Sequence, residues 1–221
     1  MCRFLLVKAA TPVQPAALLA AFADLAEHSY EATGAWQGDG WGVSWLDEAK
    51  RWRGEQSLQP IWTERGAFTR LPPSPLWLVH ARSASFPHHQ AVLAYNQPYF
   101  TDEYAFVFNG FLQGVKLPQR LPGTIGAQKI WALLQQHLRT APPAVALEQV
   151  RVTLLEHSRS IKALNIGLAD RQGAYAFCCF AANPEYYTLH LHRSPTLQMI
   201  CSEPLAGYEF SPVAANQVVM I

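Results

Sequence analysis

The chain of 221 residues has a formal net charge of +1, and 50% of its residues are apolar while only 15% are charged. This composition is typical of one folded domain with a large core, here taken as residues 1–221, and it excludes a disordered chain. Without a basic stripe, nucleic acid is excluded as a partner. The sequence contains no run of roughly 18 apolar residues, so no membrane span is expected.

Apolar periodicity and turn residues predict the elements of the first half of the chain. In chain order they are a strand over 3–8, a helix over 13–28, a strand over 41–46, a polar hairpin containing Trp52 and Trp62, a strand over 76–81, and a strand over 104–108 that Asn109-Gly110 ends.

The second half is predicted to contain two helices followed by strands. The helices cover 124–138 and 144–157, and the strands cover 163–169, 174–181, 186–192 and 197–202. Because strands, helices and strands come in blocks, the pattern favours α+β layers over alternating βαβ units.

The four cysteines are best explained as reduced thiols in a cytoplasmic protein. Cys2, Cys178, Cys179 and Cys201 show no CxxC pair and no zinc spacing, and Lys8 interrupts any signal peptide. The adjacent pair point to opposite faces of a strand, so they do not suit a disulfide with each other. We expect no metal site and no organic cofactor.

Cys2 stands directly behind the initiator methionine. Removal of Met1 is efficient when the next residue is small, and it would leave Cys2 with both a thiol and a free α-amine. That amine titrates near about pH 7.7–8.0 and can take the proton of the thiol. By position alone, a small apolar residue that begins a buried strand is the more common explanation.

Two further segments could serve an acyl-transfer reaction. Asn109-Gly110 offers a side-chain amide and an unhindered N–H for an oxyanion hole, although this dipeptide alone is more often a hairpin turn. Arg82 follows a buried strand and can hold a carboxylate, although a lone arginine is more often in a structural ion pair. His80 shares its strand face and can support the site.

Five segments in order resemble the class II glutamine amidotransferases, which are N-terminal-nucleophile (Ntn) hydrolases. The resemblance is greatest to small stand-alone members such as γ-glutamyl hydrolases, and it covers roughly residues 2–135. The segments are Cys2, Gly38-Asp39-Gly40-Trp41-Gly42, His80-Ala81-Arg82-Ser83-Ala84-Ser85, Asn96-Gln97-Pro98-Tyr99 and Phe108-Asn109-Gly110-Phe111-Leu112.

The resemblance implies a fold and a set of roles. The fold would be a four-layer αββα sandwich of two antiparallel sheets between helices. Cys2 would be the nucleophile, with Asn109 and Gly110 as the oxyanion hole. Arg82 would bind the α-carboxylate of a glutamine-like substrate, with Trp41, His80 and Ser83 lining or supporting the substrate site.

This sequence departs from the family at two positions. The family carries an Asp that accepts the substrate α-ammonium, and Gly126 stands in its place. Because a buried ammonium without an anion is disfavoured, either another residue such as Asp39 supplies the charge or the substrate has no free amine. Phe86 replaces a residue that is often His in the family.

The sequence therefore predicts an amidohydrolase that cleaves a glutamine or γ-glutamyl amide through a thioester on Cys2. The alternative is a catalytically silent or partner-dependent binding domain with an altered pocket. No synthetase domain is present in the sequence, so a small-molecule substrate is expected, with a separate synthetase partner or a homo-oligomer left open. Residues 34–40 could form a loop that closes over the site.

Overall fold

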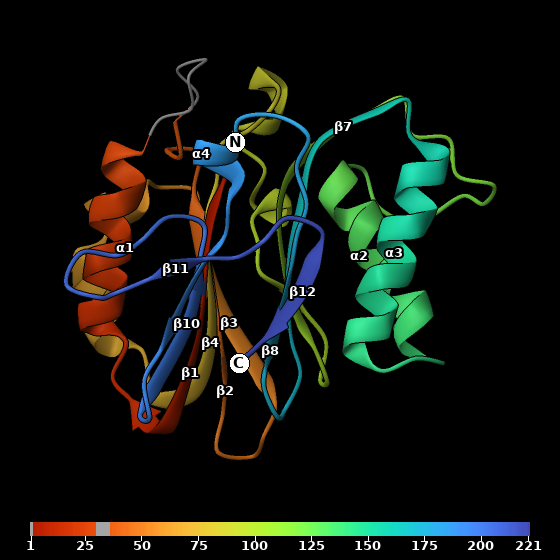
Figure 1. The fold of residues 1–221 in the computed structure, drawn as a ribbon. Helices are drawn as coiled ribbons and strands as arrows, with labels where there is room; N and C mark the ends of the chain where they lie inside the picture. Colours follow the sequence, from red (N-terminus) through yellow and green to blue (C-terminus); the bar gives the residue numbers. More distant parts are fainter. Residues whose placement is uncertain (1, 30–35) are drawn as a thin grey trace.

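Two antiparallel sheets lie face to face between layers of helices (Figure 1). The computed structural model describes residues 2–29 and 36–221. Helix α1 (Ala16–His28) covers the outer face of one sheet, and helices α2 (Gly126–Leu138) and α3 (Pro143–His157) cover the outer face of the other. This arrangement confirms the αββα sandwich that the sequence predicted.

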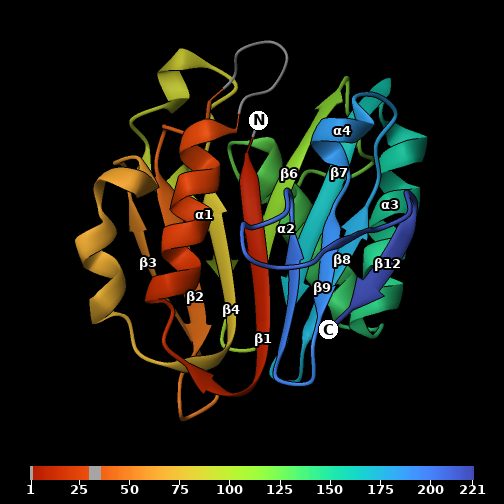
Figure 2. The same ribbon diagram turned by 60° about the vertical axis from the view of Figure 1, so that its left-hand side comes forward.

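The sheet under α1 has seven strands and includes the N-terminal strand at its centre (Figure 2). In order across the sheet the strands are β11 (Ser211–Pro212), β9 (His190–Arg193), β10 (Leu197–Cys201), β1 (Arg3–Val13), β4 (Ser74–Ala81), β2 (Trp41–Leu46) and β3 (Trp52–Ser57).

The sheet under α2 and α3 has five strands. In order they are β12 (Gln217–Met220), β8 (Ala174–Cys178), β7 (Ser160–Ala169), β6 (Ala105–Gln113) and β5 (Tyr99–Phe100). Short helical turns connect the strands of both sheets. They are η1 (Ile61–Thr63), η2 (Arg65–Arg70), η3 (Pro87–His89), η4 (Leu93–Tyr95) and α4 (Pro184–Tyr187).

The alternation of side chains along β1 builds two of the three apolar layers. Leu5 and Val7 face the core under α1, while Phe4 and Leu6 face the layer between the sheets. Because both faces are covered, the strand is apolar at successive positions, as is typical of a central strand. A third layer packs the second sheet against α2 and α3.

The pairing of β1 with β4 brings the start of the chain next to the segment that follows β4. Arg3 lies opposite Ala81 in this antiparallel pair. Cys2, one residue before Arg3, therefore comes next to Arg82 and Ser83, which follow Ala81. Two segments that are 80 residues apart in the sequence thus meet at one end of the sheet.

Several elements differ from the sequence predictions. The predicted helix over 13–28 begins only at Ala16, because β1 continues to Val13, and Trp62 lies in the helical turn η1 rather than in a hairpin strand. Strand β6 does not end at Asn109-Gly110 but continues to Gln113, with Asn109 opposite Asn165 on β7. The predicted strand over 186–192 begins only at His190, because Asn183 adopts a left-handed conformation (φ 53°) and Pro184 then starts the short helix α4. Strands β5, β11 and β12 were not foreseen.

No helix within the described ranges 2–29 and 36–221 is long and apolar enough to cross a membrane.

Candidate active site

Cys2 lies at the mouth of a cavity, held from two sides. Its main-chain N donates a hydrogen bond to Oδ1 of Asn109 at 3.1 Å. Its Sγ accepts a hydrogen bond from the main-chain N–H of Ser83 at 3.5 Å. The sequence had marked Ser83 for substrate binding only.

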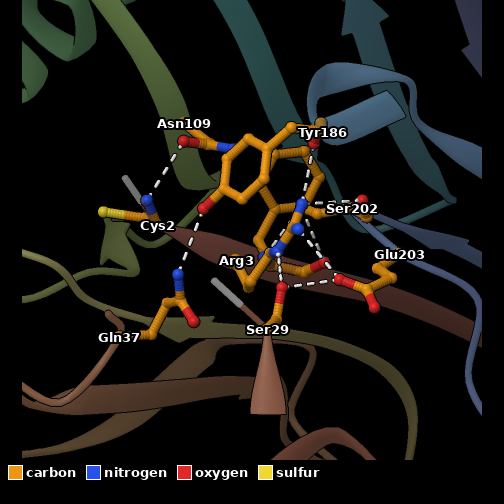
Figure 3. A network of polar contacts seen from close by, with 9 residues as sticks. Cys2, Arg3, Ser29, Gln37, Asn109, Tyr186, Ser202 and Glu203 are labelled. Atoms are coloured by element: carbon orange, nitrogen blue, oxygen red, sulfur yellow. Dashed lines mark hydrogen bonds and ion pairs between the residues drawn. The ribbon is translucent and has the colours of Figure 1, made fainter. Parts of the chain in front are cut away.

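The residue after the nucleophile anchors the start of β1 (Figure 3). Arg3 is buried, and its Nε donates to Oγ of Ser29 at 2.7 Å. Its Nη1 donates to the carbonyl of Tyr186 at 2.8 Å, its Nη2 lies 2.8 Å from Oε2 of Glu203, and its guanidinium centre lies 3.8 Å from the centroid of the Tyr186 ring. This network fixes the position of Cys2.

Asn109 is a buried amide side chain with one unpartnered donor. It is 1% exposed, and while Oδ1 accepts from Cys2, its Nδ2 has no hydrogen-bond partner in the described part of the chain. A buried amide donor without a partner is rare in folded proteins and calls for an explanation. An oxygen atom of a bound substrate would supply the missing acceptor.

A second donor follows from the direction of the β6 backbone. The main-chain N–H of Phe108 donates to Oε1 of Gln97 at 2.6 Å, so it points away from β7. Directions alternate along a strand, so the N–H of Gly110 points toward the same edge. A Cβ at Gly110 would lie 2.3 Å from the carbonyl oxygen of Ala163, which explains why glycine occupies this position.

Gln97 holds this strand edge in place, a role that the sequence did not reveal. Its Oε1 accepts from the N–H of Phe108, and its Nε2 donates to the carbonyl of the same residue at 3.4 Å. The Asn-Gln-Pro-Tyr motif was recognised in the sequence without a function for its glutamine. The side chain substitutes for a neighbouring strand and keeps the donors of β6 oriented.

Arg82 is a buried cation at the cavity wall. It is 4% exposed, and its Nη1 donates to Oδ1 of Asn96 at 3.0 Å and to the carbonyls of Gln90 and Asp39 at 3.3 and 3.4 Å. Its Nη2 donates to the carbonyl of His89 at 2.5 Å. All four acceptors are neutral, and within the described residues Nε has no acceptor and no carboxylate pairs with the guanidinium. Its charge is available to an anionic ligand.

A cavity of about 850 Å³ extends from Cys2 between the end of β6 and the beginning of α2. Its wall includes Cys2, Arg82, Ser83, Asn109 and Gly110, so five of the seven residues predicted for the site meet in one place. The volume lies within the range of small-molecule sites, about 300–1,000 Å³.

The two remaining predicted residues do not line this cavity. Trp41 is 3% exposed, packs in the core under α1, and donates from Nε1 to Oε2 of Glu64 at 2.8 Å. His80 is fully buried, and its Nε2 lies 3.3 Å from the carbonyl oxygen of Phe108. Both side chains support the site rather than face a ligand, because the alternation of side chains along β2 and β4 points them into the packed layers.

Burial keeps His80 neutral. Desolvation, partly opposed by the hydrogen bond to Phe108, lowers the pKa of His80 to about 3, with a smaller contribution from the charge of Arg82. This histidine therefore does not exchange protons near neutral pH, and among the described residues its Nδ1 lacks a hydrogen-bond partner.

The other cysteines are packed thiols. Cys178 faces the layer between the sheets and Cys179 the core under the helices, which confirms their opposite orientation. Burial raises the pKa of Cys178 to about 11 and that of Cys201 to about 12, and it also raises the pKa of Cys179. Only Cys2 combines partial exposure with a cavity.

The residues that departed from the family pattern lie as follows. Gly126 begins α2 and lines the cavity, as does Phe86, whose side chain is 52% exposed. Asp39 does not line it, and Oδ2 of Asp39 accepts the N–H of Ala84 at 2.7 Å. Over residues 2–29 and 36–221, no group of three or more His, Cys, Asp or Glu side chains is placed to hold a metal ion.

The predicted loop over residues 34–40 falls partly outside the described residues. Within the described part, Trp36 stacks on Trp62 with ring centroids 4.8 Å apart. Closure of this loop over the site stays a prediction.

Solved structures share this architecture although no protein-family model and no curated protein sequence matches the chain. A glutamine aminotransferase class-II domain protein from Silicibacter pomeroyi superposes with a TM-score of 0.66 at 16% identity, covering 100% of this chain and 94% of that one. A predicted glutamine amidotransferase from Pseudomonas aeruginosa PA01 gives 0.60 at 15% identity, covering 99% and 96%.

Glutamine phosphoribosylpyrophosphate amidotransferase from B. subtilis gives a TM-score of 0.68 at 13% identity, and the match covers 100% of this chain but 47% of that one. The chain has the class II glutamine amidotransferase fold. This confirms the fold that the resemblance implied.

Proposed function

We propose that this chain is an N-terminal-cysteine amidohydrolase that cleaves a glutamine-type or γ-glutamyl-type amide through a thioester intermediate. The observation that carries the proposal is the buried, unpartnered Nδ2 of Asn109, whose Oδ1 holds the main-chain N of the candidate nucleophile. The fold shared with class II glutamine amidotransferases supports the same conclusion.

Acylation would begin after Met1 has been removed. The free amine of Cys2 accepts the proton of its own thiol, and the sulfur attacks the amide carbonyl carbon, forming a C–S bond. The oxyanion that develops is stabilised by Nδ2 of Asn109 and the N–H of Gly110. The C–N bond then breaks, and the amine of Cys2 returns the proton to the departing nitrogen, which leaves as ammonia or an amine.

Deacylation would use water and the same groups in reverse. The amine of Cys2 takes a proton from water, whose oxygen attacks the thioester carbonyl within the same oxyanion hole. The C–S bond breaks, the sulfur recovers its proton, and the carboxylic acid is released. The Ser83 N–H, 3.5 Å from Sγ, stabilises sulfur whenever it carries negative charge.

Arg82 would hold the far end of the substrate. A desolvated guanidinium without a carboxylate partner attracts a carboxylate strongly, because charge-assisted hydrogen bonds strengthen where water is excluded. The carboxylate would accept from Nε, which has no acceptor among the described residues. This contact would fix the substrate so that its amide carbonyl meets the sulfur.

The test compares three untagged proteins. They are the natural chain, the Cys2→Ala variant, and a variant with one leucine inserted between Met1 and Cys2. The inserted variant retains its initiator methionine, so the nitrogen of its cysteine stays in a peptide bond and cannot act as a base. The assay measures ammonia released from L-glutamine and from glutaramate, its analogue without the amine. We expect turnover only in the natural chain, with both variants at least about 100-fold slower.

Full activity in the leucine-inserted protein would contradict the role of the terminal amine. Absence of turnover with Met1 removed, together with no covalent labelling of Cys2, would favour a silent binding domain instead. A separate synthetase partner that receives the ammonia remains compatible with turnover, and it would be recognised by co-purification of the two proteins from the native source.

A further inference from the structure

We propose that the substrate is an anionic amide without a free α-ammonium group: a desamino or N-acylated γ-glutamyl compound whose leaving amine carries a second anionic group. This inference rests on the proposed function, since it names the class of amide that reaches Cys2. Three independent features of the cavity lead to it.

The first feature is the sign of the charges around the cavity. Five basic side chains line it, and no Asp or Glu of the described residues does so. The basic residues are Arg82, Lys116, Arg120, Lys129 and Arg159. An ammonium group placed among them would be repelled, whereas an anion would be attracted.

The second feature is that these cations have no carboxylate partners in the described part of the chain. The ion pairs formed there involve other arginines. Lys116, Arg120, Lys129 and Arg159 are exposed and form none. They surround the part of the cavity beyond β6, in the loop before α2, on α2 itself and before β7.

The third feature is the beginning of helix α2. Gly126 opens this helix, lines the cavity, and would have nothing within 4 Å of an added Cβ. The first turn of α2 contains no acidic residue. The N-terminus of a helix carries partial positive charge, so this wall disfavours an ammonium as well.

The carboxylate suggested from the sequence as a substitute does not fill this position. Asp39 lies outside the cavity wall, and its Oδ2 is bound to the N–H of Ala84 at 2.7 Å. The cavity therefore has a site for one carboxylate at Arg82 and further cations for a second anion. It offers an ammonium group no counterion from the described residues.

A binding measurement with the Cys2→Ala protein tests this preference without relying on turnover. Calorimetric titration with glutaramate and with L-glutamine compares two ligands that differ only at the α-amine. We expect glutaramate to bind at least about tenfold more tightly, as for a group that meets no partner in its site. Equal or tighter binding of L-glutamine, or binding of neither ligand, would overturn the inference.

Substitutions at Gly126 provide a matched pair. Gly126→Asp places a carboxylate in open space at the cavity wall, and Gly126→Asn places a group of the same size without charge. In the Cys2→Ala background, we expect only Gly126→Asp to shift the preference toward L-glutamine, by about tenfold. The same shift in both variants would show that shape rather than charge decides.

The second anion is tested by turnover in the natural chain. Glutaric acid mono-4-nitroanilide and its 3-carboxy-4-nitroanilide counterpart differ by one carboxylate on the leaving amine. We expect kcat/KM to favour the carboxylated anilide at least about fivefold at low salt, with the preference shrinking as salt is added. Arg120→Gln and Lys129→Gln should reduce the ratio, while Arg70→Gln, an exposed change remote from the cavity, should not.

The two assays separate the possible failures. If neither anilide is turned over and no adduct forms on Cys2, the proposed function is contradicted. The relative affinity of Cys2→Ala for glutaramate and L-glutamine would still decide whether the cavity disfavours an α-ammonium group. Turnover with an unchanged ratio in both cavity variants would contradict the second anionic group.

Discussion

Removal of the Asn109 side chain should slow catalysis far more than it weakens the fold. Asn109→Ala deletes Nδ2, which has no partner to lose among the described residues, and one hydrogen bond from Oδ1 to the Cys2 nitrogen. Loss of one oxyanion donor lowers kcat about 10²–10³-fold, or about 2.7–4 kcal/mol of barrier. Loss of one ordinary hydrogen bond costs about 1 kcal/mol of folding free energy.

Asn165, directly opposite on β7, provides the matched control. Both ends of its amide are satisfied: Nδ2 donates to the carbonyl of Tyr187 at 2.6 Å, and Oδ1 accepts from the N–H of Cys179 at 2.9 Å. Asn165→Ala leaves two buried groups unpaired, which costs about 2–6 kcal/mol. A domain of this size then melts about 2–4 °C lower for each kcal/mol.

The assay is steady-state turnover of glutaramate together with thermal unfolding for both variants. We expect Asn109→Ala to lose kcat with a small change in Tm, and Asn165→Ala to lose Tm while its folded fraction keeps kcat. Comparable turnover in Asn109→Ala and the natural chain would refute the oxyanion role of this amide, whatever the change in stability.

Three further predictions concern His80, two glycines and the cysteines. Because the pKa of His80 is about 3 in the folded chain, only the unfolded chain binds a proton at this residue between about pH 3 and pH 6.5. The free energy of unfolding should therefore fall by up to about 1.4 kcal/mol per pH unit as the pH drops below about 6.5. Urea unfolding from about pH 7.5 to 4.5 should show a smaller fall in His80→Gln. Gly110→Ala should disrupt β6, since the added Cβ would lie 2.3 Å from a main-chain oxygen of β7. Gly126→Ala has open space around its Cβ and should keep the native circular dichroism and Tm. Equal tolerance of both substitutions would contradict the packing of β6. Iodoacetamide at neutral pH should add one group to the native protein and none to Cys2→Ala, because the other three thiols are buried. A second rapidly labelled cysteine in the mass spectrum would contradict the burial of these three thiols.

The layers of the fold were largely predictable because their strands carry long apolar or alternating runs. Strand β2 was predicted with the bounds that the structure shows. The predicted bounds of helices α2 and α3 differ from the observed ones by at most two residues. The end of β6 was predicted wrongly because Asn109-Gly110 is also a common turn dipeptide. Pairing with β7, a contact between segments remote in sequence, keeps these two residues in the strand.

The candidate site was predictable only where a motif named its residues. Cys2, Arg82 and Asn109 stand in recognisable segments, and the register of β1 with β4 then brings the first two together. Gln97 was missed as a support for β6, because its hydrogen bonds to Phe108 depend on how a loop folds back.

The charge of the cavity wall was missed for a similar reason. Its basic residues come from separate segments of the chain, such as Lys116 before α2 and Arg159 before β7, and no spacing in the sequence groups them.

The most direct test of a live N-terminal nucleophile is the intact mass of untagged protein, before and after incubation with 6-diazo-5-oxohexanoate, the diazoketone counterpart of glutaramate. We predict that the mass lacks Met1, and that one adduct forms which disappears in Cys2→Ala. A protein that retains Met1, or one that loses Met1 yet takes up no label at Cys2, would contradict the proposed chemistry.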